Sequence, residues 1–305
     1  MSFRRIFPLL ITLASSPVVA AGLKTADAPE LNYELVSDWP QLPDGWNFGP
    51  TTGVGVDSKN NVYVYHRGPH PIMCFSADGT FLRSWGDGII SGPHGLAVDR
   101  DDNVWVTDIG AHTVVKFTPK GRVLMVLGQK DTATETETTF NKPTHVAFGP
   151  SDEIYVSDGY GNSRIVKFSR DGRYLTAWGK KGEAAGEFDA PHTLAIDAQG
   201  QVYVGDRENH RVQIFDPNGK FISEWTHLGS PWGLYLGSDG YLYMSDGYND
   251  RVSKLNLQGQ LLGTFGKQGR APGELYFAHH ISLGKSGEIY VAEVQNWRVS
   301  KFVLK

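Results

Sequence analysis

The 305-residue sequence predicts an all-β protein, a six-bladed β-propeller whose ring is closed by an N-terminal strand. First, turn formers and large strand formers are abundant, with 36 Gly, 16 Pro, 8 Trp, 13 Tyr and 15 Phe. Second, one unit of short strands recurs six times along the chain. Third, the last copy lacks its fourth strand, which a segment near the N-terminus can supply.

Each repeat begins with a strand such as residues 95–98 and continues through a polar turn to a second strand and a third. A fourth strand usually ends in Trp-Gly or Phe-Gly. The second strands are residues 62–64, 104–106, 154–156, 202–204, 242–244 and 289–291. Their spacing of 40 to 50 residues suits one four-stranded antiparallel blade and is too short for an independent domain.

The two ends of the chain carry separate predictions. The last copy stops after its third strand, and residues 31–36 alternate apolar and polar side chains, as expected of a strand that completes blade six. The first 21 residues combine two arginines, a short apolar run and small residues, which indicates a signal peptide, with an uncleaved anchor as the alternative. Residues 22–305 are then expected to form one secreted or periplasmic propeller domain without a membrane span.

The charge and the cysteine content of the chain argue against a nucleic-acid partner and against an intrachain disulfide. The net charge of −4 and the absence of any Lys/Arg cluster argue against nucleic acid as a partner. The lone Cys74 excludes an intrachain disulfide and is predicted to be a buried apolar residue. We expect a monomer that binds a small molecule or a peptide.

Three histidines are singled out by their place in the repeat. The first strand of each blade lies nearest the ring axis, and its start follows the pattern Pro-x-Gly-Leu-x-Val. We call the first x of each blade the axial position; its six residues are Thr52, His94, Thr144, His192, Trp232 and His279. Because alternate blades of a six-fold ring are about 120° apart, the three histidines should meet on the axis and leave one position of a tetrahedral zinc ion open. The alternative is recurrence by descent of the repeats, which would not skip every other blade.

A second repeated position closes the second strand. An acid occupies it in five of the six blades, so its expected role is structural, bonding turn amides or the arginine that recurs nearby. Blade-specific residues stand beside it: Arg67, Tyr160, Arg207 and Tyr248. An arginine can hold a carboxylate and can lower the pKa of a neighbouring phenol, which favours an acid–base site. The remaining histidines outside the axial position, including His70, His112, His145, His210 and His227, are predicted to lie at the surface or to support the site.

Several segments resemble the peptidyl-α-hydroxyglycine α-amidating lyases, which are NHL-type propellers that release glyoxylate and leave a peptide amide. The resemblance covers nearly the whole mature chain and is most specific at residues 65–68, 92–96, 104–108, 157–165 and 206–209. It implies that His94, His192 and His279 are zinc ligands. It also implies that Tyr160 is the general base, that Arg67 is the active-site arginine that steadies phenolate and substrate carboxylate, and that Arg207 lines the pocket.

The same resemblance implies a structural calcium held by the backbone carbonyls of Val54 and Leu96 and by an aspartate directly after the third histidine. This chain has His280 at that place, and imidazole is a poor ligand for a hard cation, which argues against calcium. The leading hypothesis is a zinc-dependent carbon–nitrogen lyase acting on peptidyl-α-hydroxyglycine-like carbinolamides. Two alternatives remain: a zinc-dependent hydrolase of esters or lactones, and a non-catalytic NHL-repeat binding protein whose axial metal braces the ring.

Overall fold

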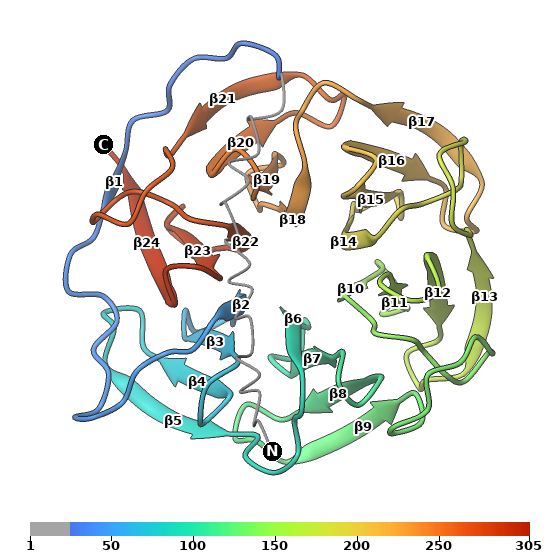
Figure 1. The fold of residues 1–305 in the computed structure, drawn as a ribbon, viewed down its shortest axis with the longest axis horizontal. Coiled ribbons are helices and arrows are strands. Elements are labelled where there is room, and N and C mark those ends of the chain that lie inside the picture. Colours follow the sequence, from blue (N-terminus) through green and yellow to red (C-terminus); the bar gives the residue numbers. More distant parts are fainter. Residues whose placement is uncertain (1–24) are drawn as a thin grey trace, which may run out of the picture.

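A computed structural model describes residues 25–305 as six four-stranded antiparallel sheets arranged in a ring, with no helix among these residues (Figure 1). The fold class predicted from the sequence is confirmed. The proposed signal peptide, residues 1–21, lies outside the described residues. No described segment forms a helix long and apolar enough to cross a membrane.

The strands follow the predicted repeat. Blades one and two comprise β2 (Thr51–Val56), β3 (Val62–His66), β4 (Ile72–Phe75), β5 (Phe81–Trp85), β6 (Pro93–Val98), β7 (Val104–Asp108), β8 (Thr113–Phe117) and β9 (Val123–Leu127). Blades three and four comprise β10 (His145–Phe148), β11 (Ile154–Asp158), β12 (Arg164–Phe168), β13 (Tyr174–Trp178), β14 (Pro191–Ile196), β15 (Val202–Asp206), β16 (Arg211–Phe215) and β17 (Phe221–Trp225). Blades five and six comprise β18 (Pro231–Leu236), β19 (Leu242–Asp246), β20 (Arg251–Leu255), β21 (Leu261–Phe265), β22 (Ala278–Leu283), β23 (Ile289–Glu293), β24 (Arg298–Leu304) and β1 (Tyr33–Leu35).

The ring is closed by the strand predicted near the N-terminus. Strand β1 pairs antiparallel with β24, with Tyr33 opposite Leu304 and Leu35 opposite Phe302, and so becomes the outer strand of blade six. The segment before it also bonds to blade five, because Leu31 N–H donates to the carbonyl of Thr264. The blue N-terminal segment therefore runs along the rim beside the last red strand (Figure 1).

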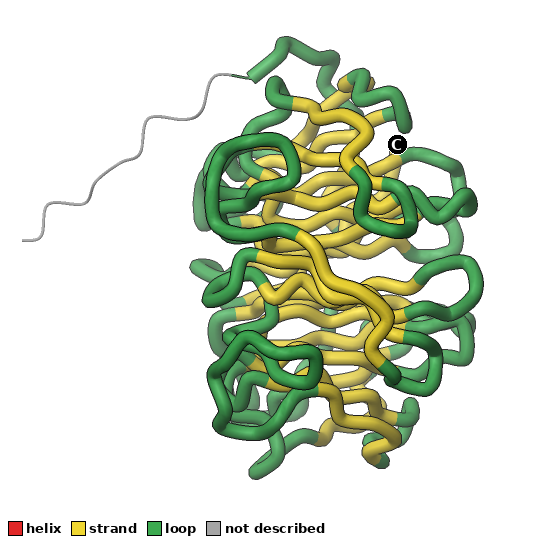
Figure 2. The backbone as a smooth tube through the Cα atoms, turned by 90° about the vertical axis from the view of Figure 1, so that its right-hand side faces the viewer, coloured by secondary structure: helices red, strands yellow, loops and turns green. Residues whose placement is uncertain are grey.

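The hydrophobic core lies between neighbouring blades, because each sheet is covered on both faces. One cluster joins Val54 and Phe75 of blade one to Tyr290 and Val299 of blade six, and five similar clusters occupy the other interfaces. Burying one such side chain stabilises the fold by roughly 1.5–3 kcal/mol. Seen on edge, the strands run across the thickness of the ring and the loops gather on its two faces (Figure 2).

The acid that closes the second strand has the expected structural role. Asp206, for example, is fully buried; it bonds Arg211 Nε at 2.8 Å and accepts the backbone N–H of Asp189. Equivalent carboxylate–arginine pairs occur in blades three, five and six. In blade one the position holds His66, whose Nδ1 accepts the amides of Gly49 and Gly68 and so replaces a carboxylate oxygen.

Candidate metal centre and active site

The three axial histidines meet at the centre of the ring. His94, His192 and His279 lie at the start of β6, β14 and β22, and their metal-binding nitrogens are all within 4.8 Å of one another. Each pair of imidazole rings has the same centroid separation of 4.8 Å, with interplanar angles of 70–73°. The arrangement is therefore close to three-fold symmetric, as the repeat spacing predicts.

Each of these rings is oriented by a backbone carbonyl. Nδ1 of His94 lies 2.7 Å from the Thr144 oxygen, Nδ1 of His192 lies 2.6 Å from that of Trp232, and Nδ1 of His279 lies 2.7 Å from that of Thr52. A carbonyl can only accept, so each Nδ1 carries the proton and each Nε2 keeps its lone pair. This is the tautomer that metal-ligating histidines adopt, with the N–H held by an outer partner.

The three carbonyl acceptors occupy the axial positions of the other blades. Thr144 belongs to blade three, Trp232 to blade five and Thr52 to blade one, so each histidine donates to the equivalent residue of the next blade. In the sequence, these three positions are distinguished only by the lack of a histidine. Their role depends on backbone atoms, but their strict alternation with histidine was visible in the repeat.

Burial keeps the three imidazoles neutral. Removal from water lowers the pKa of His94 to about 3, and it lowers the pKa of His192 and His279 well below the ordinary value. The nearby positive charge of Arg207 acts in the same direction on all three. Neutral imidazole is the form that binds a metal ion, so the donor set fits zinc or a similar divalent ion.

Tyr160 stands directly against this cluster. It follows β11, and its phenolic oxygen lies 2.9 Å from Nε2 of His94 and 3.2 Å from Nε2 of His192. Arg207 Nη1 donates to the same oxygen at 3.0 Å. A phenol, a guanidinium and the metal-facing nitrogens thus share one small region, as acid–base chemistry beside a metal requires.

Arg207 is held in place from several sides. Its Nε donates to Glu208 at 2.7 Å, and its guanidinium carbon lies 4.6 Å from the centre of the Trp232 ring and 5.2 Å from that of Tyr160. The Tyr248 hydroxyl also reaches Glu208, at 3.3 Å. The stacked guanidinium is fixed in its plane before any substrate binds, which limits the entropy lost on binding a carboxylate.

Arg67 lies on the other side of the site and differs from the expectation. Its side chain is exposed, and Nε donates to the carbonyl of Pro93, the residue before His94. The contact with the phenol that the resemblance implies for Arg67 is made by Arg207. Arg67 is placed near the metal-facing nitrogens without touching Tyr160 in this structure.

Comparisons with known proteins agree with the fold. The NHL repeat model matches residues 91–117, 140–168 and 188–215, the first three strands of blades two, three and four. A probable peptidyl-α-hydroxyglycine α-amidating lyase of Caenorhabditis elegans is 31% identical, over 82% of this chain and 81% of the relative. The chain belongs to the peptidyl-α-hydroxyglycine α-amidating lyase family of NHL-repeat propellers.

Relatives of this lyase family carry other names as well. The human NHL repeat-containing protein 3 is 31% identical over 89% of this chain and 84% of its own length. The mouse peptidyl-glycine α-amidating monooxygenase is 31% identical over 91% of this chain, and the chain spans only 32% of that protein's length.

The calcium site implied by the lyase resemblance does not fit the residues present. The Val54 carbonyl lies 3.1 Å from Nδ1 of His280, and the backbone of Leu96 faces His145. Two buried imidazoles therefore take the space between the two backbone segments, and nitrogen is a poor donor for calcium. His145, predicted to lie at the surface or to support the site, is only 5% exposed and therefore does not lie at the surface.

Proposed function

We propose that this protein is a zinc-dependent carbon–nitrogen lyase that cleaves peptidyl-α-hydroxyglycine-like carbinolamides to an amide and glyoxylate. The observation that carries the proposal is the position of the Tyr160 phenolic oxygen. It lies within hydrogen-bonding distance of two metal-facing imidazole nitrogens and of Arg207. Family membership supports the same reaction.

The three Nε2 atoms of His94, His192 and His279 would hold the zinc ion. When bound, zinc supplies a Lewis acid that polarises an oxygen of the substrate. The protein contributes the neutral donors, their fixed tautomer and the buried surroundings in which charge interactions are strong.

Tyr160 is the proposed general base. As a phenolate it removes the proton of the substrate hydroxyl, and the O–H electron pair becomes the second bond of the new carbonyl group. The C–N bond breaks with its electron pair on nitrogen, which takes the proton back from Tyr160. The products are the amide and glyoxylate, and no water is consumed.

Two arginines are proposed to hold the substrate. Arg207 already donates to the Tyr160 oxygen, while its remaining N–H groups are available for the carboxylate of the hydroxyglycine. Arg67, on the opposite side of His94, supplies the second positive charge. A substrate without a carboxylate should therefore react poorly.

Glyoxylate and amide release from an N-acyl-α-hydroxyglycine tests this proposal. Zinc-loaded protein should form the two products in equal amounts, and the variant Y160F should retain zinc but lose most of the activity. If the wild type cleaves esters or lactones and not the hydroxyglycine, the hydrolase alternative holds. If it binds zinc but turns over neither class, the metal is a structural brace.

Export is part of the proposal, because the first 21 residues have the composition of a signal peptide. N-terminal sequencing of the protein from the periplasm or medium should show a start near residue 22. Protein that stays in the cytoplasm with residue 1 intact would contradict export and leave the proposed chemistry untouched.

A further inference from the structure

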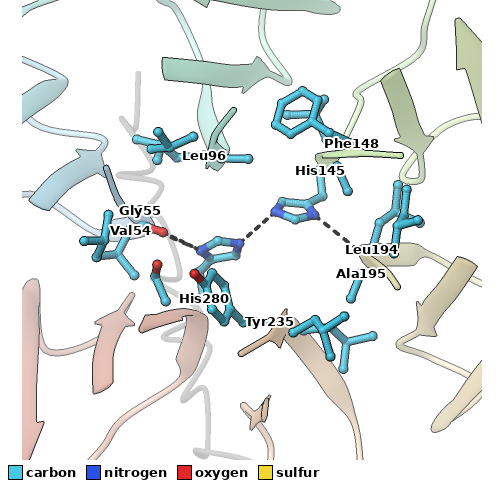
Figure 3. A pocket seen from close by; sticks show the side chains of 18 residues that line it. Val54, Gly55, Leu96, His145, Phe148, Leu194, Ala195, Tyr235 and His280 are labelled. Carbon is cyan, nitrogen blue, oxygen red and sulfur yellow. Dashed lines mark hydrogen bonds between the residues drawn. The ribbon is translucent and has the colours of Figure 1, made fainter. Parts of the chain in front are cut away.

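A second pair of histidines crosses the ring axis next to the trio. His145 follows axial Thr144 in blade three, and His280 follows axial His279 in blade six, so the two come from opposite sides of the ring. Their Nε2 atoms are 2.9 Å apart, and both side chains are 5% exposed. Figure 3 shows the two rings meeting end to end across the channel.

The direction of the hydrogen bonds follows from the outer partners of the pair. Leu194 N–H lies 3.2 Å from Nδ1 of His145 and must donate, so His145 carries its proton on Nε2 and gives it to Nε2 of His280. His280 is then protonated on Nδ1 and donates to the Val54 carbonyl at 3.1 Å. Val54 N–H also lies 3.4 Å from Nδ1 of His280. If that Nδ1 accepted this N–H, His280 would carry its proton on Nε2, and two protons would lie between the two Nε2 atoms.

The result is one chain of hydrogen bonds across four blades. It runs from Leu194 in blade four through His145 in blade three and His280 in blade six to Val54 in blade one (Figure 3). All four ring nitrogens are used, so no lone pair is left for a cation. The pocket beside the pair, about 230 Å³, has mostly apolar walls that include Val98, Phe148 and Ile196 and no carboxylate, whereas calcium takes six to eight oxygens, among them carboxylates.

The pair is also linked to the metal centre by chain connectivity. His145 is bonded to Thr144, whose carbonyl orients His94, and His280 is bonded to His279 itself. Fixing the two imidazoles therefore fixes the backbone of one ligand, His279, and the carbonyl that orients another, His94. Outer partners of this kind typically change metal affinity 10–100-fold when they are removed.

We propose that the His145–His280 pair is a cation-independent brace that takes the place of an axial calcium and positions the histidine trio. His145 and His280 are positioning residues in this account, not catalytic ones. The bracing itself does not rest on the proposed lyase function. Only its effect on metal binding rests on the proposed metal centre.

The tautomers can be read in the unmodified protein. In metal-free wild type at pH 7.5, long-range ¹H–¹⁵N correlation spectra should show His145 protonated on Nε2 and His280 on Nδ1. The trio should also carry the proton on Nδ1, which makes His145 the exception among the five histidines of the trio and the pair. A proton on Nδ1 of His145 would overturn the proposal without any variant having to fold.

Calcium dependence separates a brace from a cation site. The Tm of the wild type should be the same in excess EGTA and in millimolar CaCl₂. H280D should melt lower than wild type in EGTA and recover part of the loss in calcium, because a carboxylate then faces the Val54 carbonyl. A wild-type Tm that rises with calcium would refute the cation-independent brace.

The effect on the trio is measured with cobalt(II), whose visible spectrum reports ligand geometry. H145L should weaken cobalt binding 10–100-fold or shift the cobalt absorption bands. H145Q, whose side-chain amide can still accept and donate hydrogen bonds, should bind cobalt more tightly than H145L. H70A removes a half-buried histidine that follows β3 and contacts Asp87 and Trp46, and it serves as the matched control. An H145L protein that binds cobalt like H70A would show that the pair does not position the trio. The thermal and NMR experiments test the cation-independent brace separately.

Discussion

Arg207 Nη1 donates to the phenolic oxygen of Tyr160 at 3.0 Å, and the same guanidinium lies over the Trp232 ring. The Arg207 guanidinium is thus held beside the phenolic oxygen that lies next to the trio. Because the two side chains follow β11 and β15, their contact depends on the packing of the neighbouring blades three and four.

Removing the Tyr160 hydroxyl tests the base. We expect Y160F to lower kcat about 10²–10⁴-fold, because that is the usual contribution of a positioned general base, while zinc content stays at the wild-type level. Glyoxylate release and metal analysis measure the two quantities. Y248F, whose hydroxyl contacts only Glu208 among the described residues, is the control and should change kcat less than tenfold. Equal losses in both variants would contradict the assignment.

Neutralising Arg207 tests the cation. In R207Q we expect kcat/KM to fall at least about 10²-fold, because a charge-assisted bond to the base and a bond to the substrate carboxylate are both lost. Steady-state kinetics with carboxylate and carboxamide forms of the substrate should show that R207Q discriminates between them less than wild type. R170Q removes a surface arginine and should leave the kinetics unchanged.

Metal binding should depend on the imidazoles and not on the side chains of the residues whose carbonyls accept from them. We expect H94A, H192A and H279A each to abolish stoichiometric zinc. T144A should keep it, since the bond to His94 uses the backbone carbonyl, although lost hydroxyl contacts should lower its Tm. Plasma emission spectrometry on dialysed protein gives the zinc content. Stoichiometric zinc in any of the three histidine variants would rule out the trio as its site.

The metal-free protein should be sensitive to mild acid. Burial lowers the pKa of each histidine of the trio and of the His145–His280 pair, to about 3 for His94 and to about 4 for His280. In the native state these rings stay neutral, whereas the unfolded chain binds protons below about pH 6.5. The free energy of unfolding should therefore fall as the pH drops from 6.5 toward 4, by up to about 1.4 kcal/mol per pH unit for each histidine.

Buried carboxyl groups act in the opposite direction. Burial raises the pKa of Asp250 to about 6, and it also raises the pKa of Asp158, Asp206 and Asp246, so protonation of each in the native state offsets the proton uptake of one histidine at most. Urea unfolding of metal-free protein at pH 7.5, 6.0 and 5.0 measures the sum. A free energy of unfolding that is constant over this range would contradict the buried neutral state of the trio.

The closing strand should stabilise the whole ring. Tyr33 stacks on Phe265 of blade five with a centroid distance of 4.6 Å, while its strand β1 pairs with β24 of blade six. Y33A should cost about 1–3 kcal/mol, the usual value of a partly buried aromatic side chain with a stacked partner. Urea unfolding measures this loss. N32A, on an exposed side chain next to it, should be neutral within about 0.5 kcal/mol.

The sequence was informative where side chains recur with the repeat. It predicted six blades, the closing strand and the three axial histidines, because strand alternation and blade spacing are set by side-chain identity. It did not predict the carbonyl partners of the histidines, since backbone oxygens have no residue signature. The contact between Arg207 and Tyr160 was not predicted either, because rim side chains are long and their direction is set by neighbours such as Glu208 and Trp232.

The His145–His280 pair was missed for a different reason. Only the axial position was compared across blades, whereas the next position holds small residues in four blades and histidine in the other two. In order, these residues are Gly53, Gly95, His145, Thr193, Gly233 and His280. Comparing this second position across the six blades would have placed two imidazoles three blades apart, on opposite sides of the axis.

The blade count is what allows both histidine layers to share one axis. One layer repeats every second blade and the other every third, so a ring that carries both needs a number of blades divisible by two and by three. A five-bladed or seven-bladed ring would put two carbonyl acceptors or two histidines side by side and leave the cross-channel pair without a facing partner. Gain or loss of a single blade is therefore incompatible with this centre, even though the repeats themselves are interchangeable in their cores.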